Sequence, residues 1–112
     1  MSQILHPKID DISLAGVLYA LGDPIRLKIV ETILNHTDGM NCTLAAQQYC
    51  ETAKSTLSNH FRILREYGVI HTTKKGVENI NKVRVEELNQ LFPGLLDNIV
   101  RQMAHNKCCP AS

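Results

Sequence analysis

The chain has 112 residues and a mass of 12.5 kDa, the size of a single domain. With 44% hydrophobic and 21% charged residues, it has a globular rather than a disordered composition. It contains neither the roughly 18 consecutive apolar residues of a membrane helix nor a signal-peptide pattern, so we expect a soluble protein of the cytoplasm. The absence of tryptophan and the few aromatic residues argue against a stacking platform for single-stranded nucleic acid.

The net charge of +1 hides an uneven distribution along the chain. Residues 54–84 contain seven basic and two acidic residues, a net charge of +5, whereas the remainder has five basic and nine acidic residues, a net charge of −4. Such a chain can present one positive face to a polyanion without binding non-specifically over the rest of its surface. A solvated basic surface is the alternative, and the predicted elements decide between the two.

The predicted elements begin after a short arm over residues 1–9, which Pro7 interrupts. Apolar residues at helical spacing predict a first helix over about 10–21. Gly22 ends this helix, and Asp23-Pro24 starts a second one, because aspartate caps helix N-termini and proline is favoured at the first helical position.

The middle of the chain predicts two helices joined by a tight connection. A short helix covers about 42–49 and a longer one about 54–67. A β-hairpin is expected over about 69–84, where Lys74-Lys75-Gly76 separates two runs rich in β-branched residues.

The end of the chain predicts helices over about 85–91 and 95–105, separated by Phe92-Pro93-Gly94, and then a tail over 106–112. About five to six helices in all, with a small basic hairpin before the closing ones, predict a mainly α fold. We interpret this order as a winged helix-turn-helix domain over residues 10–105.

The longer middle helix has one apolar and one polar face at about 100° per residue. Ser, Asn and Arg are prominent on the polar face, in contrast to the Glu and Lys of ordinary helix surfaces. A shorter helix precedes it, which is the arrangement that places a second helix in the major groove. Within an arc of roughly 140° lie Lys54, Ser55, Ser58, Asn59, Arg62, Arg65 and Glu66.

A role in DNA recognition is therefore expected for this face. Asn59 and Arg62 would pair with adenine or guanine edges. Lys54, Ser55 and Thr56 would lie at the helix N-terminus, where backbone N–H groups favour a phosphate. A solvated helix surface, with Ser55 and Thr56 acting as helix caps, is the alternative interpretation.

The hairpin places Lys74 and Lys75 at its tip. Basic residues there would meet phosphates or the minor groove and add affinity with little specificity. An edge hairpin kept soluble by its lysines is the competing interpretation.

Two apolar stripes favour a homodimer. The stripe on the terminal helix is too large for a tail that lies free in water, and the first helix carries a second one. Packed across a two-fold axis, these helices would set two reading helices about one DNA turn apart. Packing within the chain is the alternative for part of each stripe. The predicted dimerisation residues are Leu14, Val17, Leu18, Leu21, Leu95, Leu96, Ile99, Val100 and Met103.

Two segments also resemble a known family. Residues 20–30 (ALGDPIRLKIV) resemble the opening signature of ArsR-type (SmtB/ArsR) winged-helix repressors, and residues 55–70 (STLSNHFRILREYGVI) resemble their recognition helix and the strand after it. The resemblance covers about residues 12–105. It implies a homodimeric transcriptional repressor that an effector releases from operator DNA. The DNA-reading positions implied are Ser55, Thr56, Ser58, Asn59, His60 and Arg62, with a wing at Lys74, Lys75 and Gly76.

Two residues of these segments suit packing better than DNA contact. His60 flanks the apolar face, which favours a structural role with partial exposure. Arg26 lies on the apolar side of its helix, between Ile29 and Ile33, and we expect a buried stem with an ion pair inside the chain.

The metal sites known in this family are incomplete here. Residues 40–44 read MNCTL, without a Cys-x-Cys pair, and Asp97 is followed at the required spacing by Ile99. Whether a metal ion binds as a cofactor therefore stays open, and the sequence assigns no other cofactor. The candidate sensor residues are Cys42, Cys50, Cys108 and Cys109.

These cysteines allow three interpretations. No CxxC spacing supports a zinc finger, and reduced thiols are expected in a chain without a secretion signal. Cys108 and Cys109, with His105, would suit a soft metal or a thiophilic metalloid. They would equally suit thiol oxidation or persulfide chemistry. The third interpretation makes Cys42 and Cys50 small core residues and the tail disordered.

Three function classes follow from these observations. A DNA-binding repressor is favoured by the polar helix face, the basic hairpin and the family resemblance. A winged-helix module for protein interaction predicts that neutralising Arg62 and Lys75 leaves activity intact. An enzyme is not expected, because the sequence offers no nucleophile–base set, phosphate loop or complete metal site.

Overall fold

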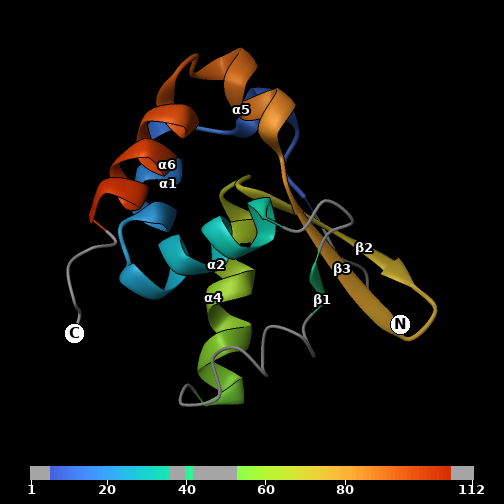
Figure 1. The fold of residues 1–112 in the computed structure, drawn as a ribbon. Helices are drawn as coiled ribbons and strands as arrows, with labels where there is room; N and C mark the ends of the chain where they lie inside the picture. The colour runs from blue at the N-terminus through green and yellow to red at the C-terminus, as the bar shows by residue number, and fades with distance from the viewer. Residues whose placement is uncertain (1–5, 36–39, 42–52, 107–112) are drawn as a thin grey trace.

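The computed structural model describes residues 6–35, 40–41 and 53–106. Its α-helices are α1 (Leu14–Leu21), α2 (Pro24–Leu34), α4 (Lys54–Glu66), α5 (Val85–Leu91) and α6 (Leu95–Asn106). Its strands are β1 (Met40–Asn41), β2 (Ile70–Lys75) and β3 (Glu78–Val83). The winged helix-turn-helix fold is confirmed. In Figure 1, the N-terminal end of α4 and the tip of the β2–β3 hairpin both extend away from α5 and α6.

The first helix is shorter than the predicted span of 10–21. It begins at Leu14 because Ser13 caps it, with the Ser13 Oγ accepting a hydrogen bond from the Gly16 N–H (3.0 Å). A single 3₁₀ turn over Ile9–Asp11 precedes the cap, so the predicted helix start at residue 10 was wrong. The second helix begins where Asp23-Pro24 predicted, because the Asp23 Oδ1 accepts from the Ile25 N–H (2.8 Å).

In the part of the chain that the structure describes, the sheet has three strands, in the order β1-β3-β2, so the expectation of a hairpin alone was incomplete. All pairs are antiparallel, and β1 pairs Met40 with Asn81. The hairpin pairing runs through Lys75 and Glu78, which leaves only two residues between the strands. Lys74 and Lys75 therefore belong to the end of β2 and not to the turn, whose first residue, Gly76, has a φ of +63°.

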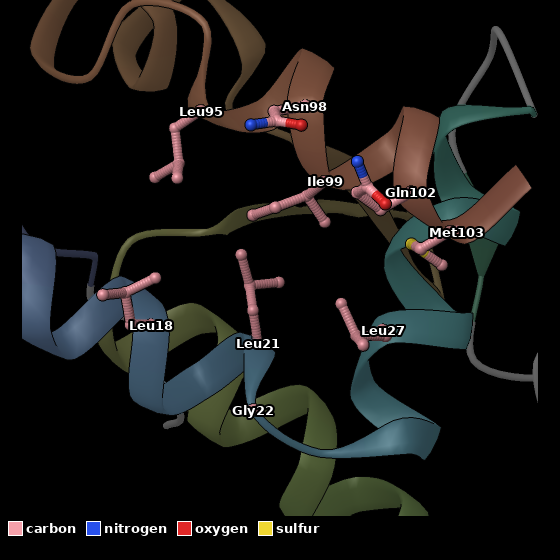
Figure 2. A pocket seen from close by; sticks show the side chains of 9 residues that line it. All are labelled: Leu18, Leu21, Gly22, Leu27, Leu95, Asn98, Ile99, Gln102 and Met103. Carbon is pink, nitrogen blue, oxygen red and sulfur yellow. The ribbon is translucent and has the colours of Figure 1, made fainter. Parts of the chain in front are cut away.

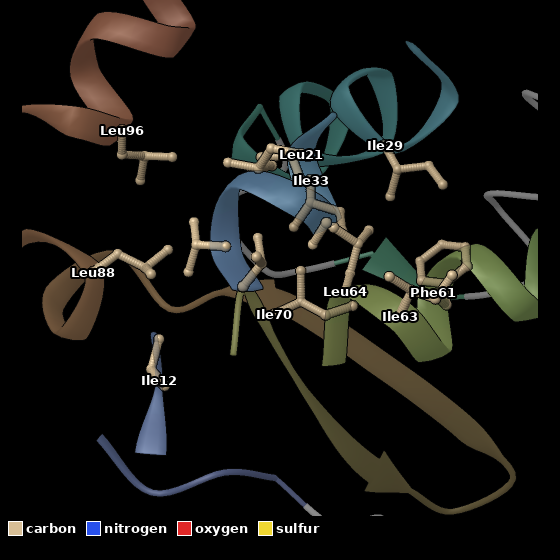
Figure 3. Packing of buried hydrophobic residues seen from close by; sticks show 14 of the residues in the cluster. Ile12, Leu21, Ile29, Ile33, Phe61, Ile63, Leu64, Ile70, Leu88 and Leu96 are labelled. Atoms are coloured by element: carbon tan, nitrogen blue, oxygen red, sulfur yellow. The ribbon is translucent and has the colours of Figure 1, made fainter. Parts of the chain in front are cut away.

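The core lies where α1, α2, α4 and the base of the hairpin meet, with α5 and α6 closing one end (Figure 3). Ile29 of α2, Leu64 of α4 and Ile70 of β2 are fully buried. At Gly68, φ is +85° and an added Cβ would lie 2.6 Å from the Ile12 side chain. Glycine at this position therefore lets the chain leave α4 and enter β2 against Ile12.

Three contacts join His6 and Pro7, in the described part of the N-terminal arm, to β2 and to Arg84, which follows β3. The Thr72 N–H donates to the His6 Nε2 (2.9 Å), and the rings of His6 and His71 stack with centroids 3.9 Å apart and planes 12° apart. The Arg84 Nη1 donates to the Pro7 carbonyl oxygen (2.9 Å). His6 therefore lies against β2, and Pro7 lies beside Arg84.

The environment of His6 disfavours its protonated form. Burial, and then the neighbouring His71, Arg84 and Arg65, lower the pKa of His6 from its ordinary value of 6.5. Glu87 offsets part of the positive charge, because both its oxygens accept from the Arg84 guanidinium (2.8 Å each). This hydrogen bonding lowers the pKa of Glu87. The arm is thus docked with a neutral His6 ring.

Candidate nucleic-acid interface

The two faces of α4 differ in exposure as the helical wheel predicted. Leu57, Phe61 and Leu64 are at most 4% exposed and face the core. The opposite side forms a polar surface that we call the reading face, with Arg65 half-buried at its edge; its exposed members are Ser55, Ser58, Asn59, Arg62 and Glu66. Thr56 is exposed beside it, and Lys54 begins the helix with a side chain outside the described residues.

The N-terminus of α4 has no side-chain cap among the described residues. Ala53 occupies the N-cap position, and the first helical hydrogen bond runs from the Leu57 N–H to the Ala53 carbonyl oxygen (2.9 Å). Ser55 and Thr56 lie inside the first turn, so neither occupies the cap position. Backbone N–H groups at such an end favour an anion.

The Arg62 side chain is held along the reading face by two residues of its own helix. The Arg62 Nη2 donates to the Asn59 Oδ1 (2.5 Å), and the Arg62 Nη1 donates to the Glu66 Oε2 (2.9 Å). The side chains of Arg62 and Glu66 are 52% and 54% exposed. The guanidinium thus lies between one partner three residues before it and another four residues after it.

His60 faces inward and is 8% exposed. Its Nδ1 lies 3.2 Å from the Arg26 Nη1, and since arginine only donates, Nδ1 accepts and Nε2 carries the ring hydrogen. The geometry therefore gives His60 a packing role and does not place it on the reading face, although the family resemblance lists it among the DNA-reading positions.

Arg26 is buried as expected, but the predicted ion pair was wrong. Within the described residues its guanidinium binds no carboxylate; the Nε donates to the Ala20 carbonyl oxygen (2.6 Å) and the Nη2 to that of Tyr19 (3.3 Å). It also lies 5.4 Å from the centroid of the Tyr19 ring. The physical reason is that α1 ends next to it, so that the last carbonyl oxygens of α1 are within reach of the guanidinium; that of Tyr19 also accepts from the Gly22 N–H (3.2 Å). Arg26 thereby joins α1, α2 and α4.

The hairpin tip is the most exposed part of the basic region. Lys74, Lys75 and Gly76 are exposed, and Val77 is 98% exposed. Apart from its two neighbours in the chain, no described residue lies within 4 Å of a Cβ built on Gly76. The tip is therefore open to solvent.

The predicted dimerisation residues divide into two groups. Val17, Leu21 and Leu96 are buried inside their own chain, so the intrachain alternative holds for them. Leu14 and Leu18 on α1 are 46% and 48% exposed. On α6, the half-buried residues are Leu95, Ile99, Val100 and Met103.

Four of these residues, Leu18, Leu95, Ile99 and Met103, line an apolar pocket between α1, α2 and α6 (Figure 2). Its volume is about 480 Å³. The lining residues are Leu18, Leu21, Gly22, Leu27, Leu95, Asn98, Ile99, Gln102 and Met103. An open apolar surface of this kind is typical of an interface or a ligand site.

The candidate sensor cysteines, Cys42, Cys50, Cys108 and Cys109, all lie outside the described residues, as does the side chain of His105. Within the described ranges, no group of three or more His, Cys, Asp or Glu residues could hold a metal ion. In the same ranges, no helix combines the length and the apolar character needed to cross a bilayer.

Three features of the site were not predicted from the sequence. Glu66 belongs to the polar arc, but its contact with Arg62 was missed, although the spacing of four residues is the signal for such a pair. The contact between Arg26 and His60 joins residues 34 apart, and that between His6 and Thr72 joins residues 66 apart. No local pattern signals these two.

Comparisons with known proteins agree with this geometry. The chain is 30% identical over 90 residues to the uncharacterized HTH-type transcriptional regulator YceK of Bacillus subtilis, which covers 80% of this chain and 89% of that protein. It is also 30% identical over 90 residues to the arsenical resistance operon repressor of B. subtilis, covering 80% and 84%. These relatives are regulators and not enzymes. No protein-family model matches the chain.

Solved structures share the fold at lower sequence identity. The crystal structure of an ArsR family transcriptional regulator, RHA00566, superposes with a TM-score of 0.63 at 20% identity. The superposition covers 82% of this chain and 96% of that one. The likeness therefore extends over the helices and the hairpin together.

Proposed function

The chain belongs to the ArsR family of helix-turn-helix, DNA-binding transcriptional regulators, and we propose that it is a repressor that binds operator DNA through the reading face and the hairpin tip. The observation that carries this proposal is the exposed polar face on α4, whose opposite side is buried, together with a basic hairpin whose tip, like the N-terminal end of α4, extends away from α5 and α6 (Figure 1). In the major groove, Asn59 and Arg62 contact base edges. Lys74 and Lys75 contact phosphates.

A titration of the reduced protein on DNA from upstream of its own gene, followed by fluorescence anisotropy, tests this function. Binding to this DNA should be tighter than to a shuffled duplex and should weaken steeply as salt rises. Arg62→Ala should reduce sequence preference, whereas Lys75→Ala should weaken binding to both duplexes. Lys28→Ala, an exposed lysine on α2, is the matched control.

The alternative is a module for protein interaction, and the same variants distinguish it. If Arg62→Ala and Lys75→Ala behave as the wild type in every assay and no salt-sensitive binding occurs, the operator-repressor proposal is wrong for that DNA.

We also propose that the repressor is a homodimer whose interface uses the exposed residues of α1 and the α6 side of the pocket. Two exposed leucines on α1, of which Leu18 lines the open apolar pocket, support this. A two-fold axis through this surface would set two reading faces about 34 Å apart, one DNA turn. Sedimentation should show a dimer that Leu18→Asp dissociates, and Val77→Asp at the hairpin tip should leave it intact.

We further propose that an effector releases the repressor from DNA in the cytoplasm, with the four cysteines as the first candidates to test. The anisotropy titration is repeated after mild oxidation or polysulfide treatment, and with zinc, cadmium or arsenite. Loss of binding only after thiol chemistry supports a redox sensor, and loss only with a metal ion supports a metal site. Unchanged binding assigns the cysteines a structural role and leaves another effector to be found.

A further inference from the structure

We propose that Glu66 is a positioning residue that raises the sequence specificity of this protein. Together with Asn59, it tethers the Arg62 guanidinium over the reading face, so that Arg62 contacts a base edge and not a backbone phosphate. The inference rests on the proposed binding of operator DNA through α4.

The tether has acceptors on both sides of the guanidinium. Asn59 accepts from Nη2 and Glu66 accepts from Nη1, so the group cannot swing far toward either end of the helix without losing one hydrogen bond. Arginine has five N–H donors, and these two contacts leave three of them available. A guanine edge, with its O6 and N7 acceptors, needs only two.

A carboxylate at this place needs an explanation, because it repels the phosphates of DNA. Its contribution to folding is small, since both partners are about half exposed and exposed ion pairs stabilise proteins little. The order along the helix, with the basic residue before the acidic one, is also the less favourable order for such a pair. What Glu66 does control is the position of Arg62.

The tether acts differently on specific and non-specific DNA. Non-specific binding consists almost entirely of phosphate contacts. Backbone phosphates border the groove and base edges form its floor, so Arg62 must leave at least one of its acceptors to reach a phosphate, whereas the donors that remain can meet a base edge. Glu66 therefore weakens non-specific binding more than operator binding, and such selective weakening increases specificity.

The test compares two duplexes: one enriched by the wild-type protein from a randomised pool, and a shuffled version of the same composition. Glu66→Ala should bind the shuffled duplex about threefold more tightly, with a smaller change on the enriched duplex. On the shuffled duplex, the logarithm of the binding constant of Glu66→Ala should also fall more steeply with the logarithm of the salt concentration. The slope should steepen by about 0.9, the value for one further phosphate contact. The control is Glu86→Ala, which removes the same charge from an exposed position on α5.

The Arg62→Ala background shows whether Glu66 acts through Arg62. In that background, Glu66→Ala should no longer change the ratio of the two affinities. Equal ratios for Glu66→Ala and Glu86→Ala, or an effect of Glu66→Ala that persists without Arg62, would overturn the inference while operator binding stands. Failure of the wild type to enrich any duplex would instead reject the proposed function, and this inference with it.

Discussion

Two arginines lie on opposite sides of α4. Arg26, from α2, contacts the buried side of this helix, and Arg62 belongs to its exposed side. Arg26 is 8% exposed and binds backbone carbonyl oxygens of α1 together with the inward-facing His60. Arg62 is half exposed, and both of its partners are side chains of its own helix. The buried arginine joins separate elements and so fixes where α4 lies. Among the described residues, the exposed one contacts only its own helix, and it keeps donors available for a ligand.

The largest effect that should separate the two arginines is on stability. Arg26→Ala removes the donors to the Ala20 carbonyl and to His60, and buried acceptors left without partners cost about 1–3 kcal/mol each. We expect the free energy of unfolding to fall by about 3 kcal/mol, measured by urea denaturation. Arg26→Lys should restore only part of this, because an ammonium group lacks the planar fork. A loss below about 0.5 kcal/mol would show that the contacts of Arg26 do not hold the fold.

The same measurement on Arg62→Ala should give a much smaller change. An exposed i,i+4 pair contributes about 0.3–0.5 kcal/mol, so the unfolding free energy should stay within that range of the wild type. DNA affinity should fall about tenfold or more, the lower range for losing a bidentate base contact. A variant that lost stability as well as affinity would remove the distinction between the two sides of α4.

The smallest effect concerns the arm, where a third set of contacts responds to pH. The pKa of His6 lies below 6.5 in the docked arm, so a released arm binds a proton more readily than a docked one. Docking is therefore complete above pH 6.5 and weakens as the pH falls through the lowered pKa. Hydrogen exchange at the Thr72 amide, corrected for intrinsic rates, should show protection that decreases from about pH 7.5 to about pH 5.

His6→Gln is the matched control for this pH dependence. Glutamine offers an acceptor oxygen that does not titrate in this range. Protection of the Thr72 amide should then vary little with pH. If the wild type and His6→Gln lose protection equally, titration of His6 does not govern docking.

The sequence predicts much of α4 because the relevant signals are local. The alternation of Leu57, Phe61 and Leu64 with polar residues repeats within one helix, and the structure has the same two faces. The pairing of Arg62 with Glu66 was equally predictable from its spacing. The start of α2 was predicted for the same reason, since Asp23 and Pro24 act on their immediate neighbours.

The remaining features depend on residues that only folding brings together. Strand β1 has two residues and is defined by its pairing with β3, forty positions away along the chain. The burial of Arg26 followed from the helical wheel, but its partners did not, because they depend on where α1 ends. The predicted contacts of the reading face with bases stay predictions.

The contact between His6 and β2 also bears on the solubility of the protein. β2 is the outer strand of the sheet on that side, and an outer strand offers its unpaired N–H groups to the strands of other molecules. The His6 ring accepts the Thr72 N–H and covers the face of His71, so this part of the edge is closed to a neighbouring strand. His6 thus blocks strand pairing at Thr72, and a chain shortened past Pro7 would expose this part of the edge to edge-to-edge pairing.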